Sequence, residues 1–416
     1  KHLKKLLAQD HRQIFTTIQK FQDIAGAISN REDIIVMTDE AHRTQYDRMA
    51  LNMRKSLPNA SFIGFTGTPL MADGEAETVK TFGEYVSVYN FSQSVADGAT
   101  VPLYYENRVP RLKNVNENLE EQLGQLMDKY EIDDEAEEKI EKEFSTFYEI
   151  ITREDRLDTI ARDIVAHYAG RGYNGKAMIV SIDKKTTIRM YDKVKKEWDR
   201  YIAKLRMDLS RAQDERGREK ILAQLEQHEN VDMAVMVSLG DNQNEISDMK
   251  EFGIDVYPIR ERILRGNLEE EFKKADSDLR IIFVCAMWIT GFDVPNLSTL
   301  YLDKPLKNHT LMQAIARANR VADEGKKNGL IVDYIGVFKN IERALALYAA
   351  SGVDENDIIK SKDELVIDLK NILRAVKVFL SAEQIEINPL LEAPSDQKIL
   401  LLEKYANAII GQQEKK

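Results

Sequence analysis

The sequence predicts an α/β protein with parallel sheets, arranged as two domains followed by a helical segment. Short apolar runs rich in β-branched residues recur along the chain, and stretches of helical period separate them. This strand–helix–strand order implies a parallel sheet with right-handed crossovers. At 416 residues the chain is long enough for two or three domains with large cores. Acidic and hydroxyl residues directly follow two of the runs, at the edge where parallel sheets bind ligands.

Composition excludes several classes of protein. An apolar fraction of 43% and a charged fraction of 31% are typical of a soluble globular protein. No apolar run approaches the roughly 20 residues of a membrane span, and residues 1–10 lack the apolar core of a signal peptide. The single cysteine, Cys285, excludes an internal disulfide and a multi-cysteine metal site. We therefore expect a cytoplasmic protein without membrane contact.

The net charge of −11 does not argue against nucleic acid as a ligand, because the charge is unevenly placed. Residues 117–143 hold twelve acids against three lysines, a local charge of −9. The remainder is close to neutral and can still hold a local basic cleft.

The first domain is expected to begin with a helix at 1–8 and a strand at 13–16. Thr16 ends that strand and Thr17 and Gln19 follow it, and their hydroxyl and amide groups can hydrogen-bond a phosphate backbone. The alternative is that the threonines cap the next helix. A buried strand at 34–38, a helix at 41–57 and a strand at 60–65 follow.

Two carboxylates, Asp39 and Glu40, stand directly after the strand at 34–38. There, one acid can hold a hydrated Mg²⁺ while its neighbour orients a water for attack on a phosphate. An ordinary strand that ends in a solvated acidic turn is the alternative. The next strand ends in the turn at 66–69, where Thr66 and Thr68 flank a glycine and could sense what the carboxylates bind.

A second α/β pattern follows residues 111–151, which are predicted to be an exposed acidic helical linker. Strands are predicted at 176–181, 232–239, 280–285, 299–302 and 330–332, with helices at 153–169, 184–227, 268–275 and 309–320. The long, charged helix at 184–227 is expected to protrude. Beyond residue 338 the pattern predicts helix only.

The helix at 309–320 carries Gln313, Arg317 and Arg320 at positions i, i+4 and i+7, which places them on one face. Two guanidinium groups and an amide can clamp a triphosphate carried by another domain and stabilise charge that develops during transfer. A surface helix with two solubilising arginines is the alternative. It does not explain why the apolar face of the helix is packed with alanine.

Four motifs, in this order, resemble those of superfamily 2 helicase-type ATPases: Asp-Glu-Ala-His at 39–42, Thr-Gly-Thr-Pro at 66–69, Thr-Gly-Phe-Asp-Val-Pro at 290–295 and Gln-x-x-x-Arg-x-x-Arg at 313–320. The runs at 15–21 and 300–320 resemble one family within it, the motor (R) subunit of type I restriction–modification enzymes. The similarity covers most of residues 11–340. It implies two RecA-like domains with ATP and Mg²⁺ in the cleft between them, duplex DNA across their surface, and an ATP hydrolase that translocates on DNA.

The resemblance also implies roles for residues by position. Asp39 would hold the Mg²⁺, with Glu40 beside it to activate the hydrolytic water, and Arg317 and Arg320 would be arginine fingers. The resemblance implies three further groups of residues. The nucleotide would be contacted by Gly291, Asp293 and Gln313, and nucleotide state would be coupled to the DNA side by His42, Thr66 and Thr68. DNA would be contacted by Thr16, Thr17, Gln19 and Ser181.

The motifs divide the chain into four expected parts. Residues 1–110 would be the C-terminal part of the first RecA-like domain and 111–151 an acidic linker or insertion. Residues 152–340 would be the second RecA-like domain, with a helical insertion near 184–230, and 341–416 the start of a helical C-terminal domain. In this family the C-terminal helices are thought to meet the methylation (M) and specificity (S) subunits, which we expect as partners besides DNA.

Two features of the family have no counterpart in the sequence. No Gly-x-x-x-x-Gly-Lys-Ser/Thr occurs, and the run at 172–177 does not replace it, because it precedes a strand where a phosphate loop follows one. The N-terminal nuclease of the family is absent as well. We therefore expect a fragment that binds ATP weakly and hydrolyses it negligibly by itself.

Two rival functions stay open. The first is a strand-separating DNA or RNA helicase of the same superfamily, for which the sequence shows no clear wedge. The second is a catalytically inactive DNA-binding scaffold. Against a scaffold stand the intact Asp39, Glu40, Arg317 and Arg320, which a scaffold does not need.

Overall fold

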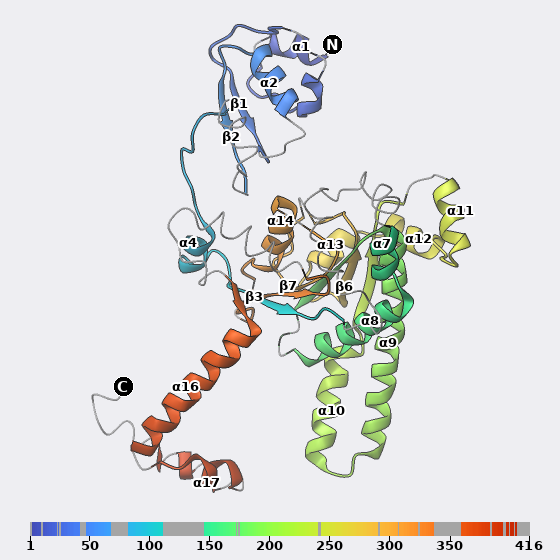
Figure 1. Cartoon of the computed structure of the whole chain (residues 1–416), viewed down its shortest axis with the longest axis vertical. Helices are drawn as coiled ribbons and strands as arrows, with labels where there is room; N and C mark the ends of the chain where they lie inside the picture. Colours follow the sequence, from blue (N-terminus) through green and yellow to red (C-terminus); the bar gives the residue numbers. More distant parts are fainter. Residues whose placement is uncertain are drawn as a thin grey trace. The chain divides into compact units, whose positions relative to one another are not determined.

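The fold was analysed in a computed structural model (Figure 1). It describes residues 2–9, 11–22, 24, 26–41, 47–67, 82–110, 145–171, 173, 175–239, 243–289, 292–306, 308–322, 325–336, 359–382, 385–393, 397–398, 400–402 and 404–405. The chain divides into two compact units, Lys1–Ile359 and Lys360–Lys416.

A small parallel sheet forms near the N-terminus of the first unit. Helix α1 (His2–Leu7) and the 3-10 helix η1 (Ile18–Phe21) precede strand β1 (Ile35–Thr38), and helix α2 (Asp47–Ser56) connects it to β2 (Ser61–Gly64). The two strands pair in parallel, with Ile35 opposite Ser61. Buried Phe21, Met53 and Leu57 supply apolar side chains to this part.

Two expectations for this region are wrong. Residues 13–16 form no strand: they are irregular, and Phe15 is 94% exposed. The strand at 34–38 exists but is not buried, because Ile35 and Met37 are 72% and 68% exposed. Since side chains alternate between the faces of a strand, the described part of the chain covers one face of β1 and leaves the other open.

The larger sheet of the unit runs in the order β5-β6-β4-β7-β8-β3, with every one of these pairings parallel. Its strands are β3 (Leu103–Asn107), β4 (Lys176–Ser181), β5 (Asp232–Met236), β6 (Leu279–Val284), β7 (Leu297–Asp303) and β8 (Gly329–Asp333). Strands β4 and β7 are buried along their whole length, as expected for a parallel sheet covered on both faces. The predicted parallel α/β fold is confirmed.

Strand β3 was not expected. It lies within residues 1–110, which the motifs assign to the first domain, yet it pairs with β8 of the larger sheet. Its residues carry a buried polar contact, since the Tyr105 hydroxyl donates to Asp333 Oδ2 at 2.6 Å. Helix α4 (Phe91–Ala96), capped by Asn90, precedes it.

Helices flank the larger sheet on both sides, and two of them form a hairpin (Figure 1). The helices are α7 (Ser145–Ile151), α8 (Glu154–Gly170), α9 (Lys184–Arg211), α10 (Glu215–His228), α11 (Gln243–Glu251), α12 (Tyr257–Arg265), α13 (Leu268–Lys273) and α14 (Asn308–Ala318). Helices α9 and α10 lie side by side and extend away from the sheet. The single helix expected at 184–227 is therefore a protruding pair, broken where Asp214 caps α10.

The C-terminal region was expected to be helical throughout, but a short strand, β9 (Ile359–Ser361), precedes its helices. The second unit contains α16 (Lys362–Ala382) and α17 (Ile387–Glu392). No helix among the described residues has the length and apolar character that a membrane crossing requires.

Candidate functional site

The acidic turn after β1 is held in an unusual backbone conformation. Glu40 has φ 51°, a left-handed conformation that costs a non-glycine residue free energy and that clusters at functional sites. Its N–H donates to Asp39 Oδ1 at 2.9 Å. Two backbone hydrogen bonds tie the turn to the end of β2: Phe65 N–H donates to Thr38 O at 2.8 Å, and Ala41 N–H donates to Phe65 O at 3.0 Å.

A glycine allows the turn to approach β2 closely. A Cβ atom placed on Gly64 would lie 2.9 Å from the Cβ of Ala41 and 3.1 Å from the ring of Phe82. Any side chain at Gly64 would therefore push Ala41, and Glu40 with it, away from the turn at 66–67. The acidic turn and the turn at 66–67 are thus mechanically linked.

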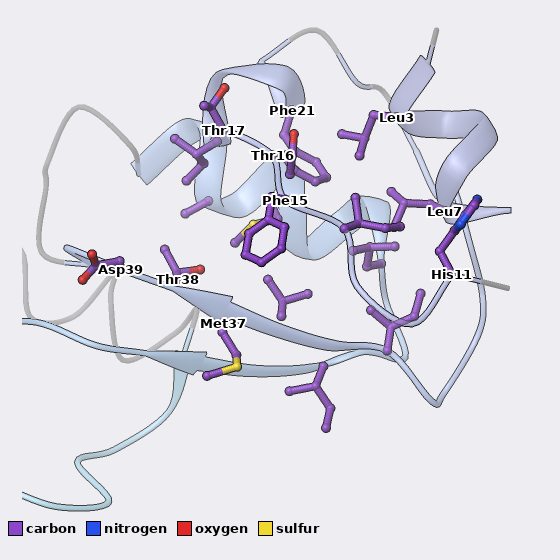
Figure 2. A pocket seen from close by; sticks show the side chains of 18 of the residues that line it. Leu3, Leu7, His11, Phe15, Thr16, Thr17, Phe21, Met37, Thr38 and Asp39 are labelled. Atoms are coloured by element: carbon purple, nitrogen blue, oxygen red, sulfur yellow. The ribbon is translucent and has the colours of Figure 1, made fainter. Parts of the chain in front are cut away.

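A pocket of ≈ 650 Å³ lies beside β1. Figure 2 shows Thr16, Thr17, Met37 and Asp39 among its lining, with Asp39 at one end. Three of the expected DNA-contacting residues, Thr16, Thr17 and Gln19, therefore border the same pocket as the expected metal-binding Asp39. Thr16, Thr17 and Gln19 are exposed, and Thr17, although it stands at the N-cap of η1, makes no capping hydrogen bond with its side chain.

Helix α14 brings the second half of the site to the acidic turn. Gln313 is 7% exposed, and its Nε2 donates to Glu40 Oε2 at 2.9 Å. Among the described residues its buried Oε1 has no hydrogen-bond partner, and a buried acceptor of this kind is costly unless a ligand or water satisfies it. The contact joins residues 273 positions apart.

The two arginines extend this contact. Arg317 Nε donates to Ile289 O at 3.2 Å, and burial, followed by the nearby Arg320 guanidinium, lowers the pKa of Arg317 from its usual value. Arg320 Nε lies 3.5 Å from Asp293 Oδ1. The acid and the three motif residues of the second half thus form one continuous polar cluster.

The helical placement of Arg320 is wrong in detail. Helix α14 ends at Ala318, and Arg320 lies beyond it in an antiparallel bridge with Thr100. The helix ends because Asn319 O accepts a hydrogen bond from Val101 N–H at 2.7 Å, which draws the chain out of the helix. Arg320 reaches Asp293 from an extended segment rather than from a helical face.

The loop that carries Asp293 is stiffened by aromatic packing. Trp288 adopts φ 67°, and its ring stacks on Phe292 with centroids 4.0 Å apart. Lys304, 1% exposed, donates from Nζ to Cys285 O at 3.0 Å and so connects the start of this loop to the end of β7. Reasoning from the sequence missed Lys304; the available signal was a lysine directly after a strongly apolar strand.

A buried ion pair fixes the same edge of the sheet. Arg156 of α8 meets Asp303, at the end of β7, in a two-pronged contact of 2.6 and 3.2 Å. Arg156 also donates to the carbonyls of Ile151 and Tyr334, each at 2.9 Å. Burial raises the pKa of Asp303, and Arg156 opposes that rise. This pair was also missed, because nothing local in the sequence joins residues 147 positions apart.

Several predicted site residues lie elsewhere. His42, Thr68 and Gly291 fall outside the described residues, whereas Thr66 is partly buried beside the acidic turn. Ser181 is fully buried at the end of β4, so its side chain is not on a surface that DNA could reach. The expected contact of Ser181 with DNA is therefore a poor fit to its position.

The cluster fits one end of a metal-bound nucleotide. The carboxylates of Asp39 and Glu40 are the oxygen ligands that Mg²⁺ prefers, and Mg²⁺ typically takes one or two carboxylates besides water and phosphate. The described residues contain no group of three or more metal-ligating side chains. Gln313 donates to Glu40, and the charge of Glu40 acts on the Arg317 guanidinium. For the remaining phosphates the sequence offers no phosphate-loop motif.

Two protein families match the chain. The SWI2/SNF2 ATPase family matches residues 1–139, and type I restriction enzyme subunit R domain 3 matches residues 171–336. A solved fragment assigned to the HsdR subunit of a type I restriction enzyme from Vibrio vulnificus is 16% identical, with a TM-score of 0.44 over 79% of this chain and 47% of its own. That structural likeness is too distant to support an argument.

Curated relatives are closer. A protein named as the type I restriction enzyme MjaIXP endonuclease subunit, from Methanocaldococcus jannaschii, is 34% identical over 88% of this chain and 31% of its own length. The type I restriction enzyme HindI endonuclease subunit of Haemophilus influenzae is 31% identical over 97% of this chain and 37% of its own length. The chain spans about a third of these relatives. By these similarities, the chain belongs to the family of type I restriction enzyme endonuclease (R) subunits.

Proposed function

We propose that this chain is the ATP-dependent double-strand DNA translocation module of a type I restriction endonuclease R subunit. The observation that carries the proposal is the 2.9 Å hydrogen bond from Gln313 Nε2 to Glu40 Oε2. It joins the acidic turn of one sheet to the arginine-bearing helix of another, which is the arrangement that a hydrolytic site between two domains requires.

Each polar group has a role in this proposal. Asp39, with Glu40 beside it, would hold a Mg²⁺ ion, which would supply positive charge next to the phosphates. Glu40 orients the attacking water and accepts its proton. Gln313 positions Glu40, and Arg317 and Arg320 stabilise the negative charge of the transition state. Asp293 holds Arg320 in place through its ion pair.

Coupling to DNA follows from the linked turns. The hydrogen bonds between the acidic turn and Phe65 let a change at the nucleotide move Thr66. The exposed Thr16 and Thr17 line the same pocket as Asp39 and Glu40, so the same change would alter their surroundings as well. Alternating grips on the phosphate backbone then step the protein along duplex DNA, before cleavage by the nuclease domain of the complete subunit.

The M and S subunits are proposed as protein partners. Helix α16 exposes several large apolar side chains, among them Ile367, Leu369, Ile372, Leu373 and Phe379. Exposed apolar surface of this kind is typical of a helix that packs against a partner. The proposed location of the protein is the cytoplasm, where a restriction enzyme meets the DNA that it cleaves.

The test of the hydrolytic role uses an R subunit that carries these 416 residues together with a phosphate-binding loop. Glu40→Gln keeps the size of the side chain and its ability to form hydrogen bonds but removes the general base. It should lower the kcat of DNA-stimulated ATP hydrolysis by about 10²–10⁴-fold. The exposed Glu219→Gln on α10 is the matched control and should leave kcat unchanged. Undiminished hydrolysis by Glu40→Gln would refute the proposed role of the acidic turn.

Translocation is separated from strand separation by a second assay on the same subunit. A translocase displaces a third strand bound to duplex DNA downstream of its loading site without separating the duplex. Release of duplex strands at a comparable rate would favour the helicase alternative, and no ATP-dependent displacement in either assay would favour a scaffold.

A further inference from the structure

Helix α9 carries a line of positive charge along the face opposite its buried side. The line consists of Lys185, Arg189, Lys193, Lys196, Arg200, Lys204 and Arg211, at steps of three or four residues, with Met207 filling the one remaining step. Residues spaced in this way lie on one face of a helix. The buried side is formed by Val194, Trp198, Ile202 and Leu205. We call the seven charged residues the cationic line.

The charge of α9 stands apart from that of the chain. The helix has ten lysines and arginines against four aspartates and glutamates, whereas the chain as a whole has 59 against 70. The four acids of α9 lie beside the cationic line and not within it. A face that served only solubility would be expected to mix both signs.

Two cations in the inner half of the cationic line, Arg189 and Lys193, are neutralised by the protein itself. Glu154 of α8 lies 2.5 Å from both Arg189 and Lys193, and Asp158 lies 2.5 Å from Lys193. These pairs fasten α9 to α8. They also hold the pKa of Glu154 below its usual range, with the contact to Lys193 as the largest cause.

The outer half, from Lys196 to Arg211, is exposed. Among the described residues it has no ion pair with another element; its one ion pair joins Arg200 to Glu197 of the same helix. Four cations on one side of a helix therefore face solvent without a counter-charge from another element in the described part of the chain. Like charges this close repel one another, so the arrangement is stabilised when an anion binds.

The outer half is held on a stiff support. Asp183 caps α9 by accepting from Thr186 N–H at 2.6 Å, and Asp214 caps α10 by accepting from Gly217 N–H at 2.6 Å. Behind the cationic line, Trp198 packs edge-on against Tyr168 of α8 and His228 of α10, with ring centroids 5.7 Å apart in each pair. Because the hairpin is fixed on its inner side, the charges keep their spacing.

We propose that the outer half of the cationic line binds the phosphate backbone of duplex DNA as a second contact, separate from the nucleotide site. The proposal rests on the proposed function and adds to it a place where the DNA lies. From Lys196 to Arg211 the helix rises about 22 Å, and duplex DNA carries one negative charge per about 1.7 Å of its axis. The line can therefore follow about two-thirds of a helical turn.

The chemistry of the face favours DNA over a protein partner. Protein interfaces are enriched in aromatic residues and depleted in lysine, whereas Met207 is the only apolar residue in the outer half of this line. Topology also separates this DNA contact from the nucleotide site. Helix α9 starts at the carboxyl end of β4 and runs back past the amino ends of the strands, whereas α14 follows the carboxyl end of β7. DNA bound here would be held at a distance from the moving cleft.

The test measures binding of the 416-residue chain to a fluorescein-labelled blunt duplex of mixed sequence, by anisotropy between about 50 and 200 mM salt. Lys196→Gln/Lys204→Gln removes two cations of the line. Arg216→Gln/Lys220→Gln removes two exposed cations of α10 and is matched in charge and in location on the hairpin. Far-UV circular dichroism verifies that both variants keep their helix content.

The first variant should bind more weakly and reduce the slope of log affinity against log salt by about two, since each phosphate contact contributes about 0.9. The second should keep the parent slope. Equal losses in both variants, or an unchanged slope in the first, would overturn the cationic line as a DNA contact while leaving the proposed function in place. A parent chain that binds no duplex even at the lowest salt would overturn both.

Discussion

The side chain of Gln313 donates from Nε2 to Oε2 of Glu40 at 2.9 Å. Glu40 stands in a left-handed turn after β1, and Gln313 is buried on α14, so the bond connects the two halves of the site through an acid that has little freedom to move. A hydrogen bond to a charged group contributes about 1.5–3 kcal/mol, enough to select one orientation of the Glu40 carboxylate.

Reversing the polarity of this contact tests it. Gln313→Glu is nearly isosteric but replaces the amide donor with a second carboxylate, which repels that of Glu40. In an R subunit with a phosphate loop, we expect DNA-stimulated kcat to fall by about tenfold or more, because Glu40 is displaced from its position beside α14. Gln313→Leu, which only loses the bond, should show a smaller loss. A Gln313→Glu enzyme as active as the parent would show that the contact does not control Glu40.

Gly64→Ala should loosen the link between the two turns. The added methyl group meets the Cβ of Ala41 at 2.9 Å, and overpacking of this kind typically costs about 1–3 kcal/mol. We expect faster amide hydrogen exchange at Ala41 and Phe65, whose N–H groups make the two linking bonds. Gly67→Ala, where an added Cβ meets no atom of the described residues within 4 Å, is the control and should leave the exchange rates as they are.

Lys176 should give the larger sheet a distinctive pH dependence. Its side chain is fully buried at the start of β4, and burial lowers its pKa from 10.5 to about 8. Between these two values the unfolded chain binds a proton that the folded protein does not, so folding stability rises with pH across this window. The full rise corresponds to about 3 kcal/mol.

Lys176→Met should remove this rise, so that the difference in unfolding free energy between parent and variant changes from pH 8 to 10.5 and is constant below pH 8. Urea unfolding followed by tryptophan fluorescence measures it, because the two tryptophans, Trp198 and Trp288, both lie in this part of the fold. If the difference in unfolding free energy between parent and variant stayed constant from pH 8 to 10.5, the lowered pKa of the buried Lys176 would be contradicted.

The Arg156–Asp303 pair predicts a double-mutant result. Arg156→Met leaves Asp303 buried without its counter-charge and should destabilise the fold by about 3–5 kcal/mol, whereas Arg156→Met/Asp303→Leu should recover most of that loss. Thermal unfolding monitored by tryptophan fluorescence reports both. If the destabilisation of the double variant equalled the sum of the destabilisations of the two single variants, the unpaired buried charge would not be the cause of the lost stability.

Local patterns in the sequence were sufficient for most elements. The apolar run at 176–181 became β4 and the helical period at 153–169 became α8, since each is decided by periodicity within the segment. The acidic turn and α14 were also found in this way, because their residue types are adjacent or recur at helical spacing.

What the sequence did not predict depends on partners far along the chain. Strand β3 exists because it pairs with β8, whose residues lie more than two hundred positions later. The end of α14 is set by Val101, and the exposure of Ile35 follows from which helices cover β1. The contact between Glu40 and Gln313 was expected as a relation between motifs, but its atoms required the folded chain.

A double-mutant cycle on DNA-stimulated ATPase tests the central claim most directly, using Glu40→Gln, Arg317→Ala and the two combined in an R subunit with a phosphate loop. If both residues act on one transition state, each single change should lower kcat by about 10²-fold or more and the combination should be little worse than the more damaging single change. Losses that multiply in the combined variant, or full activity of Arg317→Ala, would contradict a shared nucleotide site between the acidic turn and α14.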